Sequence, residues 1–464
     1  MKEKRELIKN TVIISIGKFS TRLVSFFLLP LYTAILLPAE KGEVDLLNRI
    51  SMFLMPLITL QMEEALFRFL IDVKSKKDKE DVFSSALMFS LVSGIVWSII
   101  IFIVGNLLHY QYTIWLIIYS LASFVYALAD GFLRGDNKLK MYSILAFFNS
   151  VINISLNIVF LVILKTGLEG MFLAYIIATF ITGIFGLIYV KAYKYGRLKF
   201  NKNKLKEMLK YALPFVPTTL SWSVISLTDS LMITTNLGAS MNGIYSTSMT
   251  FPTILNTFYS FFNISWRASA SKMVNKKDKD EFYISVYITL KRLLLGVLLL
   301  IISALPFAYG ILVNKNYQEG YLYIPFMIIS VYFSSLASFS SGIFSAYKDT
   351  KILATTTYIV ALINLVIDLL LINKIGLFAP IIGTLVSYLI VWIYRNYKLR
   401  KYLTLPLDNY FIWNIIMVAI VMAIYYSNNK ILYLIGLLTS IGYSYLINQS
   451  IVKKVIKKII KKSR

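Results

Sequence analysis

The sequence predicts an all-α integral membrane protein of about 14 transmembrane helices, since each apolar stretch reaches the ~20 residues that span a bilayer. Three observations predict this class. The chain of 464 residues is 58% hydrophobic, its apolar stretches follow one another with short polar connections, and its positive charges sort to one side. We expect two parallel six-helix bundles, related by a pseudo-twofold axis along the membrane normal, plus two C-terminal helices.

The predicted spans divide into three parts. Residues 1–195 hold the first bundle, residues 205–400 the second, and residues 405–464 the last two helices and a basic cytoplasmic tail. The spans cover residues 11–37, 43–70, 82–108, 112–134, 140–164, 167–193, 207–236, 240–272, 281–313, 319–346, 349–373, 376–397, 408–427 and 430–450.

The distribution of the 48 lysines and arginines fixes the predicted orientation. Most of them fall in the loops and tails on the side that holds both termini. The opposite side receives Lys41, Lys165, Lys315, Lys374 and Lys430. Cytoplasmic loops carry such an excess of positive charge, so we expect a bacterial cytoplasmic membrane protein with both termini inside. The net charge of +25 then faces anionic lipid rather than nucleic acid.

Composition also excludes several kinds of chemistry. The chain has no cysteine and one histidine, His109, which excludes thiolate sites and a histidine-based metal cluster within one chain. The predicted loops are too short to form an extramembrane domain, which a membrane glycosyltransferase or polymerase would normally need. The sequence therefore predicts neither an enzyme nor a metal site, and no organic cofactor.

The two halves repeat each other at a spacing of about 200 residues. Gly42 and Gly243 occupy matching outer turns, and Arg68 and Arg267 precede two similar charged loops, Lys76–Asp81 and Lys276–Glu281. Each half contains six predicted spans, an even number, so both halves point the same way. Parallel repeats of this kind are typical of transporters, with the substrate site at their interface.

Several segments resemble the polysaccharide (Wzx-type, lipid-linked oligosaccharide) flippase branch of the multidrug/oligosaccharidyl-lipid/polysaccharide exporter (MOP) superfamily. Leu29–Thr33 (LPLYT), Leu37–Gly42 (LPAEKG) and Glu64–Phe69 (EALFRF) resemble that family's opening helix pair, and Leu237–Ser246 resembles the matching turn of its second half. The resemblance implies transfer of an undecaprenyl-diphosphate-linked oligosaccharide from the inner to the outer leaflet by alternating access. A polysaccharide polymerase and glycosyltransferases are the protein partners it implies.

Other functions compete with this one. A cation-coupled multidrug exporter of the same superfamily would need an acid-rich cavity, whereas more basic than acidic side chains are assigned to the membrane interior. The seven basic ones are Lys18, Arg22, Arg49, Arg68, Arg267, Lys291 and Arg292, and the five acidic ones are Glu63, Glu64, Asp130, Asp229 and Asp368. A scaffold without transport activity is disfavoured by the repeat, and a membrane glycosyltransferase or polymerase by the short loops. In one respect the chain departs from the family, because Asp229 is followed by Ser230 where members often carry arginine.

Cations inside a membrane need a partner or a wet cavity, because burying one costs roughly 2.5–3.5 kcal/mol on insertion scales. We predict that four of them bind the substrate diphosphate, since a guanidinium matches phosphate oxygens bidentately. These are Lys18, Arg22, Arg49 and Arg292. The alternatives are structural ion pairs for Lys18 and Arg22, pairing with Asp45 for Arg49, and interfacial snorkelling for Arg292.

The remaining intramembrane charges suggest a gate and a coupling site. Arg68 and Arg267, paired with acids of the first half, form a predicted inner gate; plain helix-end charges are the alternative. The acids are Glu63, Glu64 and Asp130. Asp229 and Asp368 are predicted to couple transport to H⁺ or Na⁺, because a buried carboxyl group takes up a proton or cation readily; hydrogen-bonded structural acids are the alternative.

Overall fold

The structure is a computed structural model, and it describes residue 26 and residues 28–73, 75–197, 201–349, 351–406 and 410–462. These residues form helices joined by short connections, and the described ranges contain no β-strand. An α-helix satisfies its backbone hydrogen bonds internally, which a segment within lipid must do. The all-α membrane class predicted from the sequence is confirmed.

The chain divides into two compact units, Met1–Gly243 and Ile244–Arg464. The helices of the first unit are α2 (Leu29–Ile35), α3 (Pro38–Thr59), α4 (Met62–Ile71), α5 (Lys76–Leu107), α6 (Thr113–Gly135), α7 (Leu139–Asn157), the π-helical η1 (Ile158–Ile163), α8 (Gly167–Tyr189), the short η2 (Ala192–Lys194), α9 (Lys202–Ala212) and α10 (Phe215–Leu237). The boundary between the units falls within α11 (Ala239–Ser248). The second unit continues with α12 (Pro252–Met273), α13 (Lys279–Leu312), the short η3 (Lys315–Leu322), α14 (Ile324–Ala346), α15 (Lys351–Ile375), α16 (Phe378–Leu399), α17 (Phe411–Tyr425) and α18 (Lys430–Lys462).

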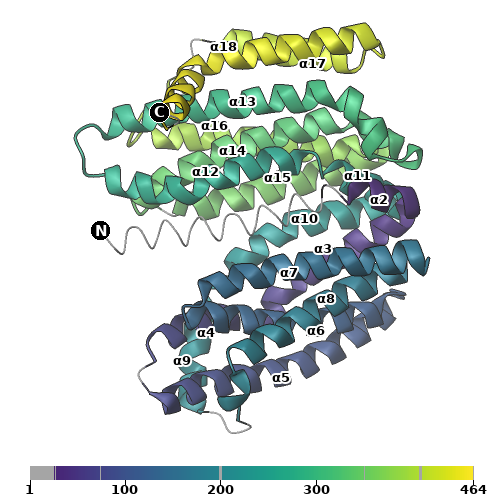
Figure 1. The fold of residues 1–464 in the computed structure, drawn as a ribbon, viewed down its shortest axis with the longest axis vertical. Helices are drawn as coiled ribbons and strands as arrows, with labels where there is room; N and C mark the ends of the chain where they lie inside the picture. The colour runs from purple at the N-terminus through teal and green to yellow at the C-terminus, as the bar shows by residue number, and fades with distance from the viewer. Residues whose placement is uncertain are drawn as a thin grey trace. The chain divides into compact units, whose positions relative to one another are not determined.

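The described part of the chain contains nine helices long and apolar enough to cross a membrane, or ten if α3 and α4 form one bent span. The apolar helix α17 is shorter, with 15 residues. Most of the predicted span at 11–37 lies outside the described residues. Every later predicted span coincides with at least one helix (Figure 1), so the protein is a multi-pass membrane protein.

Some predicted spans are broken in the structure. The span at 43–70 divides into α3 and α4, which meet at 51°. The break lies at Leu60 and Gln61, where both residues adopt positive φ angles of 44° and 57°. Pro56 lies within the last turns of α3, and a proline removes one helical hydrogen bond. The span at 240–272 likewise divides into α11 and α12.

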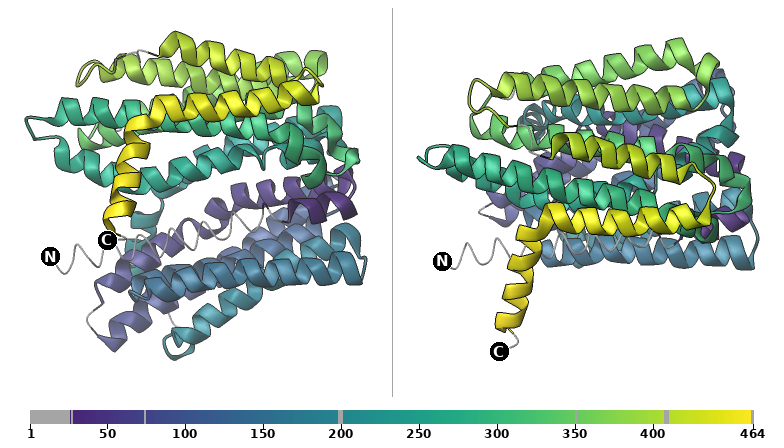
Figure 2. Two further views of the ribbon diagram at one scale, coloured as in Figure 1. Left: turned by 45° about the horizontal axis from the view of Figure 1, so that its top comes forward. Right: turned by 90° about the horizontal axis from the view of Figure 1, so that it is seen from above.

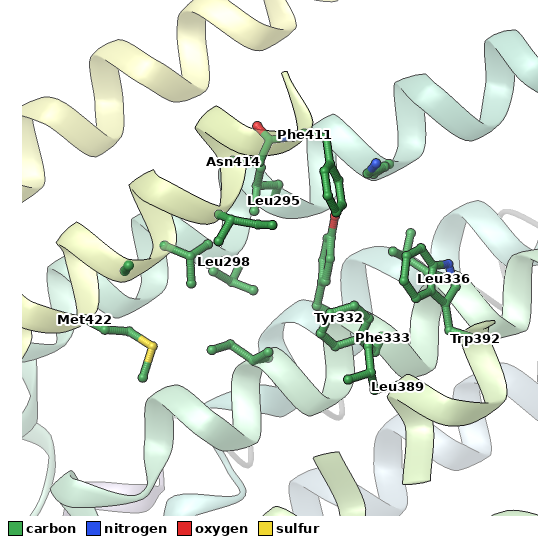
Figure 3. Close-up of a pocket in the computed structure, with 15 residues that line it drawn as sticks. Leu295, Leu298, Tyr332, Phe333, Leu336, Leu389, Trp392, Phe411, Asn414 and Met422 are labelled. Carbon is green, nitrogen blue, oxygen red and sulfur yellow. The ribbon is translucent and has the colours of Figure 1, made fainter. Parts of the chain in front are cut away.

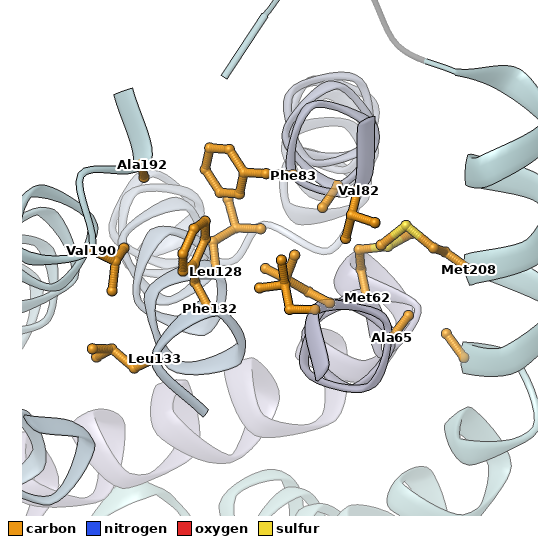
Figure 4. Packing of buried hydrophobic residues seen from close by; sticks show 14 of the residues in the cluster. Met62, Ala65, Val82, Phe83, Leu128, Phe132, Leu133, Val190, Ala192 and Met208 are labelled. Carbon is orange, nitrogen blue, oxygen red and sulfur yellow. The ribbon is translucent and has the colours of Figure 1, made fainter. Parts of the chain in front are cut away.

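One of the apolar clusters inside the first unit lies where α4, α5, α6 and α9 meet. Met62 and Leu66 of α4 pack with Phe83 of α5 and Phe132 of α6, and Met208 of the amphipathic helix α9 closes the cluster (Figure 4). The rings of Phe83 and Phe132 meet edge to face at 5.0 Å. Helix α9 overlaps only the start of the predicted span at 207–236. It covers this core, so it belongs to the packing of the first unit.

An aromatic stack joins α12 to α14 in the second unit. The rings of Trp266 and Phe339 lie 4.3 Å apart, and the Trp266 indole donates to the Phe339 carbonyl at 2.9 Å. Helix α18 lies along α13 (Figure 1). Its last turns bend away from the direction of the rest of the helix (Figure 2). Those turns carry the basic residues of the predicted tail.

The repeat-related glycines Gly42 and Gly243 meet in the first unit, where the start of α3 crosses α11. A Cβ atom on Gly243 would lie 1.8 Å from the carbonyl oxygen of Pro38, and one on Gly42 would lie 1.9 Å from that of Ala239. Small residues allow such close backbone approach between membrane helices. The two glycines therefore set the distance between these helices.

The structural units differ from the predicted domain limits. The predicted boundary between the two bundles lies near residue 200, where the repeat begins again. In the structure, α9 and α10 belong to the compact unit that ends at Gly243. The reason is packing: α10 lies against α3, and α9 against α4 and α5. The last two helices, predicted as a separate part, belong to the second unit because α18 and α17 pack against α13.

Candidate functional site

Two of the four predicted diphosphate ligands, Lys18 and Arg22, lie outside the described residues. The other two, Arg49 and Arg292, lie in different units, on α3 and α13. Each is half-buried, so each is described below with its own surroundings.

Arg49 joins α3 to α10. Its Nε atom donates to Asp45 Oδ2 at 2.5 Å, the intrahelical pair that the sequence offered as an alternative. Its Nη1 atom donates to the hydroxyl oxygen of Ser226 at 2.9 Å and to the Ser226 carbonyl at 3.2 Å. A partly exposed arginine thus crosses from one helix to another, and Asp45 is one partner of its charge.

A polar chain continues from this arginine towards the outer turns. Ser230 on α10 donates towards Asp45 Oδ2 at 3.3 Å and shares a 3.0 Å hydrogen bond with Asn242 Oδ1. Asn242 in turn donates to the Gly42 carbonyl at 2.8 Å. Ser230, the residue at which the sequence departs from the family, therefore connects α10 to Asp45 of α3 and to Asn242 of α11. Asp229, the neighbouring predicted coupling acid, is buried on the same helix.

Two of the three acids of the predicted inner gate contact Arg134, the last residue of the predicted span at 112–134. Arg134 at the end of α6 contacts Glu64 Oε1 at 3.0 Å and Asp130 Oδ2 at 2.6 Å. Glu63 is the neighbour of Glu64 on α4. The arrangement ties α4 to α6 at the inner end of the first unit.

The predicted pairing of Arg68 with these acids is wrong. Arg68 is exposed and pairs with Asp72, four residues later, at 2.5 Å. This pairing is the plain helix-end arrangement, because residues four apart share one face of a helix. Arg267 is exposed on α12, and its role in a gate stays a prediction. The i, i+4 spacing of Asp130 and Arg134 was the sequence signal that pointed to the observed pair.

Asp368 lies at the crossing of α15 with α16. Its side chain is fully buried, and a Cβ atom on Gly383 would lie 3.0 Å from Asp368 Oδ1 and 3.2 Å from Asn364 Nδ2. Asn364 donates to the Thr384 hydroxyl at 3.1 Å. A carboxylate, an amide group and a hydroxyl group thus lie close together in a buried place between two helices.

Arg292 and Lys291 of α13 lie beside the start of α17. The Arg292 guanidinium stacks over the Tyr410 ring at 5.0 Å, and the Lys291 ammonium lies 5.4 Å from the centre of the Phe411 ring. Lys291 is buried and Arg292 is half-buried. Arg292 as a diphosphate ligand stays a prediction.

A buried arginine in the second unit was missed by the sequence analysis. Arg395 on α16 is 8% exposed and donates to neutral oxygens of two other helices. Its Nη1 contacts the Ser341 hydroxyl at 2.7 Å and the Ala337 carbonyl at 2.9 Å, and its Nη2 contacts the Thr356 hydroxyl at 2.6 Å. It stands near the end of the predicted span at 376–397. In the structure it clamps α14, α15 and α16 together.

Comparison with known proteins gives the family. The model of a family described as polysaccharide biosynthesis protein matches residues 7–267. An uncharacterized membrane protein of Methanocaldococcus jannaschii is 24% identical over 299 residues, which are 61% of this chain and 70% of that protein.

Two solved structures share the fold. The lipid II flippase MurJ, in an inward closed conformation, has a TM-score of 0.72 and 16% identity, over 96% of this chain and 100% of that chain. An inward-facing multidrug resistance MATE family transporter of the MOP superfamily has a TM-score of 0.66 and 15% identity, over 88% of this chain and 99% of that chain. The chain therefore belongs to the polysaccharide biosynthesis protein family and has the fold of the MOP superfamily, as its sequence resemblance predicted.

Proposed function

We propose that the protein is a flippase that moves an undecaprenyl-diphosphate-linked oligosaccharide from the inner to the outer leaflet of the cytoplasmic membrane. The observation that carries the proposal is the family match over residues 7–267, because this family is described by polysaccharide biosynthesis. The fold shared with the lipid II flippase MurJ supports a lipid-linked substrate. Transport needs no covalent chemistry, so no catalytic group is assigned.

In this proposal, cations neutralise the diphosphate while the polyprenyl tail stays in lipid. Arg49 is the best described of the predicted ligands. Its guanidinium is held at Nε by Asp45 and at Nη1 by Ser226, and the hydroxyl contact can be exchanged for a phosphate oxygen without losing the ion pair. Ser226 lies on α10, so that exchange would alter the tie between α3 and α10. Binding of substrate and movement of these helices would then be coupled.

Replacement of Arg49 by alanine tests the diphosphate role. We expect flipping of a lipid-linked oligosaccharide in reconstituted vesicles to fall by at least about tenfold, because a charge-assisted bidentate contact contributes roughly 1.5–3 kcal/mol. Arg49→Lys keeps the charge without the planar fork and is expected to recover only part of the rate. Arg22→Ala is expected to behave as Arg49→Ala does. Arg68→Ala, at the exposed pair with Asp72, is the control and should leave flipping unchanged.

The result that removes Arg49 from the site is an unchanged flipping rate in a variant that is reconstituted to the same level as the wild type. An equal fall of the flipping rate in Arg68→Ala vesicles would indicate that loss of either cation impairs the insertion of the protein into the vesicles or changes its orientation there. Measuring protein orientation in the vesicles separates these two outcomes.

We further propose that Asp368 couples transport to Na⁺ or H⁺. Asp368 is buried beside Asn364, and Thr384 lies within hydrogen-bonding distance of that amide. An ion bound there would hold α15 against α16, and its release would loosen that contact. Asp229 is the second candidate, buried in α10.

Asp368→Asn is expected to abolish the dependence of flipping on a Na⁺ or proton gradient. An amide is neutral, so it can neither balance the charge of a bound Na⁺ nor take up a proton as a carboxylate does. Flipping in vesicles is measured with each gradient imposed separately. Asp280→Asn, at an exposed acid at the start of α13, is the matched control. A variant that keeps the gradient dependence of the wild type would exclude Asp368 as the coupling residue.

A cation-coupled multidrug exporter is the second candidate, because the MATE transporter shares the fold. Both functions can be measured in the same vesicles. Accumulation of an organic cation, without movement of a lipid-linked oligosaccharide, would favour the exporter. We place a polysaccharide polymerase and glycosyltransferases among the partners of the flippase, since its product must be assembled before and extended after transfer.

A further inference from the structure

The second unit contains a cavity of about 430 Å³ that the proposed transport cycle does not use. Its walls come from α13, α14, α16 and α17 (Figure 3). Apolar side chains form most of the lining, among them Leu295 and Leu298 of α13, Phe333 of α14 and Met422 of α17. Its volume lies within the ~300–1,000 Å³ of typical ligand pockets. One end, however, differs from the rest.

Two hydrogen-bond donors line the cavity at the start of α17. Lys291 is 5% exposed, and its ammonium lies near the Phe411 ring. Asn414, one turn further along α17, is 6% exposed. Its Oδ1 accepts from the Tyr443 hydroxyl at 2.7 Å, whereas its Nδ2 is buried and makes no hydrogen bond within the described part of the protein.

A buried donor without a partner costs about 1–3 kcal/mol, so the Asn414 amide points to an acceptor supplied by a ligand. Lys291 adds a positive charge at the same end. The first turn of α17, a helix of 15 residues, adds the backbone N–H groups and the partial positive charge of a helix N-terminus. The cavity therefore has an apolar body, and the buried side chains of Lys291 and Asn414 and the first turn of α17 lie together at one end.

We propose that this cavity binds an anionic diacyl glycerophospholipid of the inner leaflet. Lys291 contacts the phosphate, Asn414 Nδ2 donates to an ester carbonyl, and one acyl chain lies along the apolar walls. Basic pockets between transmembrane helices on the cytoplasmic side are a known way of recognising such headgroups. The distribution of positive charge puts this end of α13 on the cytoplasmic side.

The positions of Phe411 and Asn414 along α17 agree with the spacing of the phosphate and ester groups in a phospholipid. Asn414 lies about 4.5 Å beyond Phe411 along the axis of α17, at 1.5 Å per residue. That offset places the amide below the phosphate, at the level of the ester groups of a lipid. From Asn414 to Met422, α17 runs for a further distance of about 12 Å along apolar side chains of the cavity. A polyprenyl carrier offers no ester carbonyl to Asn414, so we assign the site to a resident lipid.

Lipid titrations of the purified full-length protein test the proposal. The melting temperature in detergent is followed while phosphatidylglycerol, phosphatidylcholine or undecaprenyl phosphate is added. We expect phosphatidylglycerol to raise the melting temperature most. Lys291→Met should weaken the affinity for phosphatidylglycerol about fivefold, as one interfacial cation contributes about 1 kcal/mol. Lys398→Met, at an exposed lysine at the end of α16, is the control and should bind as the wild type does.

Asn414→Leu tests the ester contact. The wild type is expected to bind ester-linked phosphatidylglycerol more tightly than its ether-linked analogue, and Asn414→Leu to bind both equally. Ala419→Phe, which fills the cavity from α17, should remove the effect of phosphatidylglycerol while the protein still elutes as a single species. This variant keeps the test decisive if Lys291→Met fails to fold.

Three results would overturn the proposal. Equal effects of phosphatidylglycerol and phosphatidylcholine would show that the headgroup is not recognised. Equal losses in Lys291→Met and Lys398→Met would indicate general attraction of anionic lipid to the inner surface. A larger effect of undecaprenyl phosphate, removed by Ala419→Phe, would assign the cavity to the polyprenyl carrier.

Discussion

Replacing Gly243 with alanine is expected to lower the free energy of unfolding by about 3 kcal/mol, at the upper end of the usual effect of overpacking. The added methyl group would lie 1.8 Å from the carbonyl oxygen of Pro38. That neighbour is a backbone atom, so the clash can be relieved only by moving α3 away from α11. The loss is measured as a fall in the melting temperature of the purified protein, followed by tryptophan fluorescence.

Gly442→Ala is the matched control. Gly442 lies within α18, and a Cβ atom there meets nothing within 4 Å. Alanine is the better helix former by about 1 kcal/mol, so this substitution should leave the melting temperature unchanged or raise it. Gly42→Ala is expected to act like Gly243→Ala, and the double variant to lose less than the sum, since both alter one helix crossing. Equal shifts in Gly243→Ala and Gly442→Ala would show that the crossing is not tightly packed in solution.

The sequence predicted the class and most of the helices because the apolar stretches are long and their lengths match a bilayer. It also indicated the intrahelical pair of Asp45 with Arg49, since a separation of four residues is local information. It identified Gly42 and Gly243 as repeat partners, but their direct contact depends on how α3 and α11 cross. No local pattern encodes that crossing. The same holds for the bond from Arg49 to Ser226, which joins residues 177 positions apart.

The charges near span ends were harder to assign from the sequence. Arg134 and Arg395 each stand near the end of an apolar stretch, where a cation usually belongs to the adjoining loop. In the structure each belongs to a helix and contacts neighbouring helices. Arg134 had a visible partner in Asp130, four residues before it. Arg395 has no acid three or four residues away on either side, and its partners are neutral groups on α14 and α15, so the sequence contained no signal for its burial.

Replacing Arg395 with leucine is expected to lower the free energy of unfolding by roughly 3 kcal/mol, because hydrogen bonds to a charged group contribute about 1.5–3 kcal/mol each and buried acceptors are left behind. Membrane-insertion scales predict the opposite effect of Arg395→Leu, since leucine enters a membrane more favourably than arginine by about 3 kcal/mol. That preference largely cancels in a melting experiment, because α16 stays in the micelle when the tertiary contacts are lost. The expected result is therefore a lower melting temperature and a lower yield of monodisperse protein.

Two further substitutions separate the contacts of Arg395 from its charge. Arg400→Leu removes an exposed cation just past the end of α16 and should change the free energy of unfolding by less than about 0.5 kcal/mol. Thr356→Val keeps the arginine but removes the hydroxyl that accepts from its Nε and Nη2 atoms. If the clamp is real, Thr356→Val is destabilising alone and adds little to Arg395→Leu. A higher melting temperature for Arg395→Leu would mean that desolvation of the guanidinium outweighs its hydrogen bonds, as happens for some buried ion pairs. In that case the contact between the three helices would have to come from apolar packing, and Thr356→Val would be neutral.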